Sequence, residues 1–413
     1  MDVMTENKVE PKLRFGEFKD NWNNHLLDDI ATFLKGKGIS KSELDDDGKT
    51  ECIRYGELYV YYNELIDEVK SKTNLENLVL SKANDVIIPA SGETQLDIAT
   101  ASCVLRSGIA LGGDLNVIRT ENNGLFLSYY LNSKKKFEIA RLSQGSSVVH
   151  LYASQLKTLK LNLPILPEQQ KIASFLSAVD EKLQQLTKKK ELLEEYKKGL
   201  MQQIFSQELR FKDANGNNYP DWEEKKLEEV FENIGGTALE NHFSDKGEYF
   251  VISIGNYGVD GKYNDNGQRI VLNEKTKTKL LDKDNLVMVL NDKTKTGDII
   301  GSTILIDEEN KYIYNQRSER LICETTIITP LYAWTFLNSK QFRRLVFSIS
   351  QGGTQIYVNF SAVKKLKSPI PCIEEQCKIA NFFSAIDGKI ELVSTQIENT
   401  KAFKKGLLQQ MFV

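Results

Sequence analysis

The segment EQQKIASFLSAVDEKL, which begins at Glu168, is repeated as EQCKIANFFSAIDGKI from Glu375, 207 residues further along the chain. The same offset relates KKGLMQQIF at 197–205 to KKGLLQQMF at 404–412. A sequence that returns at a fixed period indicates a duplicated structural unit. We therefore predict that the 413 residues form two related halves, in line with the two or three domains expected for this length.

Each repeated segment is predicted to be a long amphipathic helix. Apolar residues recur every three, four or seven positions with lysine and glutamate between them, and prolines stand just before each helix. At 1.5 Å per residue the first helix would be a rod of roughly 55 Å. The residues that we predict to pair the two helices are Ile172, Phe175, Val179, Leu183 and Leu186 in the first and Ile379, Phe382, Ile386, Ile390 and Val393 in the second.

Two long apolar stripes in one chain predict an intramolecular coiled coil, because an unpaired stripe would expose a continuous apolar ridge. The stripes alone leave open whether the helices run parallel or antiparallel.

The remaining sequence forms two bodies with an α+β pattern. Short apolar runs such as DVIIPA at 85–90 and NLVMVL at 285–290 are broken by Gly, Asn and Asp, and helical segments ending in LNS follow at 125–133 and 331–339. We expect a curved, mostly antiparallel sheet with a few helices in each body. The predicted domains are a first body at 1–162, a helix at 163–206, a second body at 207–366 and a second helix at 367–413.

Composition excludes several classes of protein. With 27% charged residues and a net charge of −3, the chain is not a polycation that coats nucleic acid. Its five cysteines form no CxxC pair and only three histidines are present, so we expect neither a metal site nor a disulfide framework. The N-terminal sequence lacks the apolar core of a signal peptide, and no run of 18 apolar residues occurs. We expect a cytoplasmic protein that does not enter a membrane.

The sequence motifs of nucleotide-dependent and hydrolytic enzymes are missing. GKT at 48–50 has Glu43 where a phosphate-binding loop requires glycine, and neither GxGxxG after a strand nor GxSxG is found. We therefore predict a binding protein with no catalytic residues of its own.

The order of body, helix, body and helix resembles the specificity subunit of type I restriction-modification systems. The resemblance covers essentially the whole chain. It rests on Pro164 to Phe205, Pro371 to Phe412, the LRF and Trp at the beginning of each body (13–15 and Trp22; 209–211 and Trp222) and the Gln-Gly turns at 144 and 351.

This resemblance implies that each body is a target recognition domain that binds one half of a split site in double-stranded DNA. It implies that the helices are antiparallel, that they set the spacing of the half-sites, and that they hold two methyltransferase (modification) subunits, with restriction or motor subunits completing the complex. S-adenosylmethionine, ATP and magnesium would then belong to the partner subunits, and none to this chain.

Candidate DNA-contacting residues combine Lys and Arg, which neutralise phosphates, with Asn, Gln and small turn residues, which pair with base edges or approach the backbone closely. In the first body they are Lys35, Lys37, Lys41, Arg54, Ser91, Gly92, Thr94, Gln144, Gly145, Ser146 and Ser147. In the second body they are Asn256, Tyr257, Asn291, Lys293, Lys295, Arg317, Arg320, Gln351, Gly352, Gly353, Thr354 and Gln355.

Two alternatives stay open at this point. A specificity subunit of a type IIB-like restriction system would have much the same sequence, and a coiled-coil adaptor whose bodies bind protein would suit the slightly acidic net charge.

Overall fold

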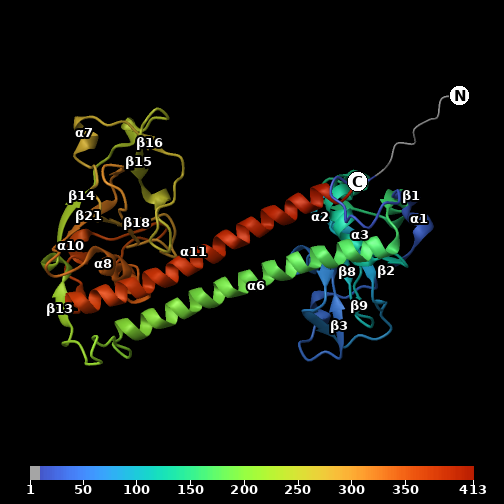
Figure 1. Cartoon of the computed structure of the whole chain (residues 1–413), viewed down its shortest axis with the longest axis horizontal. Coiled ribbons are helices and arrows are strands. Elements are labelled where there is room, and N and C mark those ends of the chain that lie inside the picture. The colour runs from blue at the N-terminus through green and yellow to red at the C-terminus, as the bar shows by residue number, and fades with distance from the viewer. Residues whose placement is uncertain (1–9) are drawn as a thin grey trace. The chain divides into compact units, whose positions relative to one another are not determined.

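A computed structural model describes residues 10–413. The first nine residues, on which the expectation of no signal peptide partly rests, lie outside the described part. The chain divides into two compact units, one made of the residues up to Lys188 together with Ser394–Val413, the other of Lys189–Val393. Both long helices continue from one unit into the other, as the green and red helices of Figure 1 show.

Body 1 is built on a five-stranded sheet with the order β2-β10-β6-β8-β4 and a three-stranded sheet with the order β5-β3-β9. Two short strand pairs, β1-β12 and β7-β11, complete it. The strands are β1 (Asn23–Leu26), β2 (Ala31–Lys35), β3 (Thr50–Ile53), β4 (Leu65–Ile66), β5 (Ser71–Thr73), β6 (Asp85–Pro89), β7 (Ser91–Gly92), β8 (Ser102–Val104), β9 (Ala110–Leu111), β10 (Leu115–Thr120), β11 (Val149–His150) and β12 (Lys160–Leu163).

Short helices cover and connect these sheets. They are α1 (Leu27–Ile30), η1 (Lys41–Glu43), η2 (Tyr55–Tyr59), α2 (Gln95–Ile98), α3 (Gly124–Tyr130), the π-helical turn η3 (Leu131–Lys135), α4 (Lys136–Leu142) and α5 (Ala153–Leu156). The core beneath α3 is aromatic, with Phe126, Tyr129 and Tyr130 fully buried.

Body 2 repeats this plan with a four-stranded sheet, β14-β21-β17-β19, and a three-stranded sheet, β16-β15-β20. Its strands are β13 (Glu223–Lys226), β14 (Phe231–Gly235), β15 (Tyr249–Ile252), β16 (Arg269–Ile270), β17 (Leu286–Val289), β18 (Asn291–Asp292), β19 (Thr303–Leu305), β20 (Tyr312–Tyr314), β21 (Ser318–Cys323), β22 (Ile356–Tyr357) and β23 (Lys367–Ile370). Its helices are η4 (Leu227–Glu229), η5 (Glu240–His242), η6 (Ile254–Asn256), α7 (Glu274–Lys277), α8 (Pro330–Leu337), α9 (Lys340–Ser348) and α10 (Phe360–Val363).

The expectation of two α+β bodies with mostly antiparallel strands is confirmed. The strands of each body are divided between a main sheet and a second sheet, however, instead of forming one curved sheet. Parallel pairs occur as well, between β3 and β9, β4 and β8, and β15 and β20. The short apolar runs of the sequence could not show this division, because strands of three or four residues fit either sheet equally well.

The two long helices, α6 (Leu166–Phe205) and α11 (Ile373–Gln410), pack antiparallel within each unit. In the first unit Lys404 near the end of α11 lies 2.7 Å from Asp180 in the first half of α6. In the second unit Lys197 near the end of α6 lies 2.7 Å from Asp387 in the first half of α11. The two ion pairs are equivalent, because each residue lies 207 positions from its counterpart.

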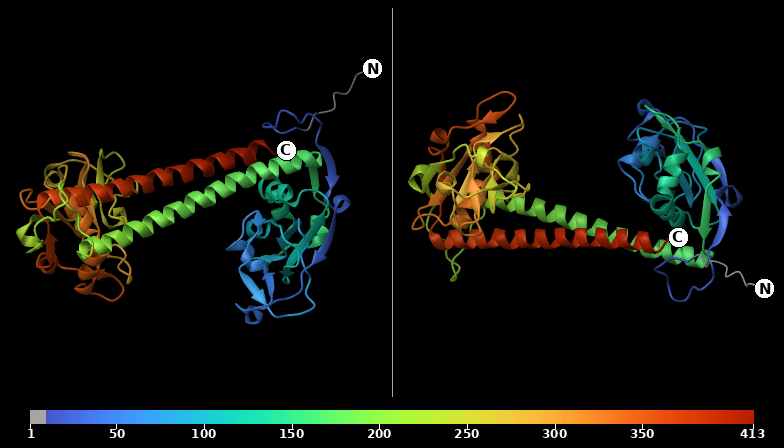
Figure 2. Two further views of the ribbon diagram at one scale, coloured as in Figure 1. Left: turned by 60° about the horizontal axis from the view of Figure 1, so that its bottom comes forward. Right: turned by 90° about the horizontal axis from the view of Figure 1, so that it is seen from above.

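The phenylalanine that ends each repeated helix segment is inserted into a hydrophobic core. Phe412 stacks on Tyr130 with ring centroids 5.5 Å apart, and Figure 2 shows the C-terminus beside the start of α6. Phe205 packs in the second unit against Phe336, with centroids 5.4 Å apart. The repeated QQIF and QQMF endings therefore anchor the helices.

The residues predicted to pair the helices lie in several environments. Ile172 and Val179 share a buried cluster with Leu407 of α11, and Ile379 and Ile386 share one with Ile204 of α6. Phe175 and Phe382 instead make edge-to-face contacts with Phe15 and Phe211. The others are Leu186 and Val393, which are buried, and Leu183 and Ile390, which are half-buried.

The start of α6 is fixed by a fully buried carboxylate, Glu168. The guanidinium of Arg14 donates two hydrogen bonds of 2.8 Å to its two oxygens, and the indole N–H of Trp22 donates to it over 3.4 Å. A bidentate pair of this kind fixes orientation as well as distance. The segment that contains LRF and Trp22 is thus hydrogen-bonded to the start of α6.

The second copy repeats this arrangement at Glu375, which is also fully buried. Arg210 donates two hydrogen bonds to it, over 3.3 and 2.7 Å, and Trp222 donates one over 2.8 Å. Because β1 pairs with β12 and β13 pairs with β23, both chain ends of each body meet at this point.

The glutamine that follows each buried glutamate bonds another part of the body, the residue before α3 or α8. Gln169 accepts a hydrogen bond from the backbone N–H of Asn123, just before α3, and donates to the carbonyl of Pro164. Gln376 accepts one from the backbone N–H of Thr329, just before α8, and donates to the carbonyl of Pro371. The repeated Glu-Gln pair is therefore a structural clamp.

Glu168→Gln removes the charge that compensates Arg14 at a site from which water is largely excluded. We expect the free energy of unfolding to fall by about 3 kcal/mol, since breaking a buried ion pair leaves the other charge uncompensated. Urea unfolding of the full chain measures this. The control is Glu17→Gln, whose ion pair with Lys171 is half exposed at both partners, and which should change stability little. An equal loss in the free energy of unfolding in the two variants would contradict the role of Glu168 in fixing the helix start.

Another buried carboxyl, that of Glu319 in β21, predicts that stability depends on pH. It is 6% exposed and accepts a 2.7 Å hydrogen bond from Asn233, and burial raises its pKa above the ordinary value. The unfolded chain therefore loses this proton first, so Glu319 lowers stability progressively as the pH rises above the ordinary pKa of a glutamate, about 4.3.

Glu319→Gln should accordingly gain stability over the unmodified chain as the pH rises above this value, because the amide cannot ionise. Asp265→Asn should behave oppositely, since the hydrogen bond from Arg269 lowers the pKa of Asp265 and stability from this pair is lost as the pH falls. Chemical unfolding at several pH values distinguishes the two variants. If the difference in the free energy of unfolding between Glu319→Gln and the unmodified chain did not change with pH, the raised pKa of Glu319 would be refuted.

Candidate nucleic-acid interface

Two of the predicted turns of body 1 lie side by side. β7 pairs antiparallel with β11, which places Ser91 opposite His150. Gln144 and His150 exchange backbone hydrogen bonds of 2.9 and 2.7 Å, so that residues 144–150 form a hairpin loop. The loop tip is exposed, including the side chains of Ser146 and Ser147. Thr94, in the turn after β7, is exposed as well.

Body 2 has the same pair of loops. β18 pairs antiparallel with β22, and Gln351 exchanges backbone hydrogen bonds with Tyr357. Lys293 and Lys295 after β18 are exposed, as are all the candidate residues of the hairpin, which are Gln351, Gly352, Gly353, Thr354 and Gln355. The predicted turns therefore form one exposed surface on each body.

The glycine of each Gln-Gly turn is required by the hairpin geometry. Gly145 has φ +117° and Gly352 has φ +109°. A Cβ atom at either position would lie 2.1 Å from a carbonyl oxygen, that of Val148 or that of Gln355. The recurrence of Gln-Gly at the 207-residue offset thus reflects a shared loop shape, on which the exposed side chains differ.

Backbone hydrogen bonds link the segments of two basic candidates of body 1, Lys37 and Arg54, to residues in and after β9. The backbone N–H of Lys37 donates to Leu111, and that of Gly112 donates to Ile53, next to Arg54. Lys35, Lys37 and Lys41 are exposed. The hydroxyl of Tyr59 donates to the carbonyl of Ser91 over 2.8 Å and so joins this group to the hairpin loops.

Several candidates serve the fold instead of offering a free side chain. Asn256 is fully buried and accepts a hydrogen bond from the backbone N–H of Ser253. Tyr257 is 5% exposed and donates to Ser318. Ser91 and Gly92 are buried, Arg54 lies 3.5 Å from Glu57, and Arg320 donates to Asp282. Asn291 is half-buried.

Arg317 is the exposed arginine among the candidates of body 2. It has φ +73°, and its carbonyl accepts a hydrogen bond from Leu290, the residue before β18. The structure thus joins Arg317 to the Asn291 to Lys295 turn and to the hairpin of β22.

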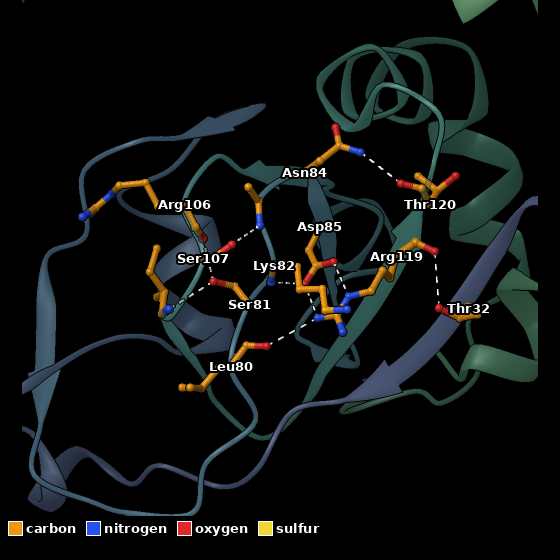
Figure 3. A network of polar contacts seen from close by, with 12 residues as sticks. Thr32, Leu80, Ser81, Lys82, Asn84, Asp85, Arg106, Ser107, Arg119 and Thr120 are labelled. Atoms are coloured by element: carbon orange, nitrogen blue, oxygen red, sulfur yellow. Dashed lines mark hydrogen bonds and ion pairs between the residues drawn. The ribbon is translucent and has the colours of Figure 1, made fainter.

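Two arginines of body 1 outside the candidate surface, Arg119 and Arg106, are paired with carboxylates of the same body. In Figure 3, Arg119 reaches Asp85 at the start of β6, with hydrogen bonds of 2.8 and 2.7 Å to the two carboxylate oxygens. The candidate turn at Ser91 follows the opposite end of β6. Arg106 lies 2.8 Å from Glu51 in the same way. These pairs leave the exposed lysines to supply positive charge.

Sequence reasoning missed exposed apolar and aromatic side chains of body 1. Tyr59 contacts the Ser91 backbone, and Val60 and Tyr61 beside it are 71% and 59% exposed. Burial of the hydroxyl raises the pKa of Tyr59, so it stays a hydrogen-bond donor. Tyr152 is 54% exposed and stacks on His150. The run YVYY at 59–62 was the available signal.

Within residues 10–413, no helix is both long and apolar enough to cross a membrane. No group of three or more His, Cys, Asp or Glu side chains among them is arranged to hold a metal ion, and the five cysteines are unpaired.

Comparison with known proteins gives consistent results. Over 405 residues the chain is 27% identical to the type I restriction enzyme MjaVIII specificity subunit of Methanocaldococcus jannaschii, covering 94% of this chain and 91% of that one. It is 22% identical to the putative type I restriction enzyme MjaX specificity subunit of the same organism, covering 96% and 94%.

Two solved structures share the fold. The S subunit of a type I restriction-modification system from M. genitalium superposes with a TM-score of 0.64 at 17% identity, covering 98% of this chain and 99% of that one. A chain solved in work on complex assembly and conformational transition of the type I R-M system gives a TM-score of 0.56 at 14% identity, covering 95% and 97%.

The sequence profile of the type I restriction modification DNA specificity domain matches twice, at residues 19–195 and 219–401. Each match takes in one body and most of the long helix that follows it. The two matches together span most of the chain, and the protein therefore belongs to the family of type I restriction modification DNA specificity domains.

Proposed function

We propose that this protein is the DNA specificity subunit of a type I restriction-modification complex and that each body reads one half of a split DNA site. The observation that carries the proposal is the pair of exposed loops that each body presents at the same place in its fold, within a chain of this family. Such loops offer small, polar and basic side chains to base edges and phosphates.

The two bodies differ where the loops are exposed. Body 1 presents Thr94 with Ser146 and Ser147, whereas body 2 presents Lys293 and Lys295 with Thr354 and Gln355. Different donors and acceptors select different base pairs in the major groove. We therefore propose that the half-sites have unlike sequences.

The chemistry of the complex is assigned to partner subunits. This chain would bind and position DNA without catalysis, while S-adenosylmethionine, ATP and magnesium would be bound by modification and restriction subunits. The chain lacks the sequence motifs for these groups. We assign the complex to the cytoplasm, where its DNA substrate would lie.

Exposed aromatic residues on the long helices support docking of two like partners. Tyr196 on α6 and Phe403 on α11 occupy equivalent positions 207 residues apart, and each is 55% exposed. A large aromatic side chain left in water at both repeated positions is typical of a protein interface. We propose that each receives one modification subunit.

Removal of the exposed loop side chains of one body should alter recognition of one half-site. For Thr94→Ala/Ser146→Ala/Ser147→Ala we expect tenfold to hundredfold weaker binding to the half-site of body 1, about 1–3 kcal/mol per lost base contact. For Lys293→Ala/Thr354→Ala/Gln355→Ala we expect the same at the other half-site. The site is found by sequencing methylated DNA, and binding of the co-purified complex to duplexes with one altered half is then measured. Absence of any site preference in the unmodified complex would refute the proposed function.

Loss of one aromatic contact should remove one partner. Tyr196→Ser and Phe403→Ser are each expected to reduce the complex from two modification subunits to one, and the double variant to none, as measured by mass photometry. Phe137→Ser is the control, because Phe137 is 66% exposed but lies on α4 in body 1. Retention of two partners by both single variants would contradict these docking sites.

A further inference from the structure

The first unit contains a groove where body 1 meets the long helices. It has a volume of about 550 Å³ and lies between the π-helical turn η3, α6 and the last turns of α11. Leu183 and Leu408 form its apolar floor, and Lys134, Lys401, Lys404 and Lys405 line it. None of the candidate DNA-contacting residues taken from the sequence lines this groove.

The lysines of this groove divide into two kinds. Lys404 contacts Asp180 and Glu64 at 2.7 and 3.2 Å, and Lys401 contacts Glu398 at 2.9 Å. Lys134 and Lys405 have no hydrogen-bond or ion-pair partner among residues 10–413. Lys404 and Lys401 are therefore neutralised by carboxylates of the chain. Lys134 and Lys405 leave two uncompensated positive charges in the groove.

The second unit has lysines at the equivalent positions. Lys198 lies 207 residues before Lys405, and Lys340 follows the second LNS as Lys134 follows the first. Gln341 donates a hydrogen bond to the carbonyl of Gln202, which brings α9 against the end of α6. The like charges of Arg344 and Lys198 lower the pKa of Lys340, which shows how closely these cations gather. Neither Lys198, Lys340 nor Arg344 has an ion-pair partner among the described residues.

Cations held together without counter-charges repel one another, and an oxyanion between them removes this cost. Lysine meets such a group as a flexible point charge and does not require the bidentate geometry of arginine. We infer that each unit binds a backbone phosphate of the DNA at this place, with Lys134 and Lys405 in the groove of the first unit and with Lys198 and Lys340 at the equivalent positions of the second. This inference rests on the proposed function.

A sequence-independent contact explains why these lysines recur in both units while the reading loops differ. Phosphates are the same at every half-site, so their contacts need not change when a body reads other bases. In a chain with a net charge of −3, the lysines without a partner at these two places add local positive charge to that of the loops.

The salt dependence of DNA binding tests the inference. Each phosphate that a lysine neutralises contributes about 0.9 to the slope of log affinity against log salt concentration. For Lys134→Gln/Lys405→Gln, and separately for Lys198→Gln/Lys340→Gln, we expect this slope to fall by roughly 1 in the co-purified complex, because each variant loses one phosphate contact. Affinity should fall equally for a duplex with the methylated motif and for a scrambled duplex, so that the ratio between them is unchanged.

The control is Lys182→Gln/Lys389→Gln, which removes the same charge from two exposed, equivalent positions on the helices. Lys404 and Lys197 stay intact in every variant, because they hold the helices together. A slope equal to that of the control would overturn the inference. Release of a partner subunit with an unchanged slope would also overturn it and would assign these lysines to contact with a protein. In both cases a retained preference for the motif leaves the proposed function standing.

Discussion

The structure depends on a buried carboxylate at the start of each long helix. Glu168 and Glu375 each accept hydrogen bonds from an arginine and a tryptophan at the beginning of the body. The next residue, Gln169 or Gln376, is hydrogen-bonded to the residue before α3 or α8. Removing such a charge from water costs several kcal/mol, so it persists only where every partner is in place. One helix turn thereby fixes both ends and the middle of a body.

The sequence predicts the duplication and the helices well, because long periodic segments and exact offsets are strong signals. It identified LRF and Trp22 as matched features but not their role, since Glu168 lies more than a hundred residues away in the chain. Asn256 was wrongly predicted to contact DNA. Its amide is suited to reading adenine, yet the fold buries it as a cap, and burial is not visible in a loop sequence.

The two copies share the contacts that hold the helices together, whereas their exposed loop side chains differ. Contacts that recur, such as Lys404 with Asp180 and Lys197 with Asp387, hold helices, and the recurring glycines fix loop shape. The exposed side chains of the loops differ between the copies. Pairwise identity within one chain thus performs part of the role that an alignment of relatives would, although it cannot name the bases that are read.

The meeting of both chain ends of a body at one helix start has an evolutionary consequence. Because β1 pairs with β12 and β13 with β23, a body begins and ends within the spacing of two neighbouring strands. Recombination between genes at these two borders would exchange a whole body as a cassette while leaving the helices untouched. A population that carries such chains can therefore acquire new DNA specificities in single steps, without passing through an intermediate that fails to assemble.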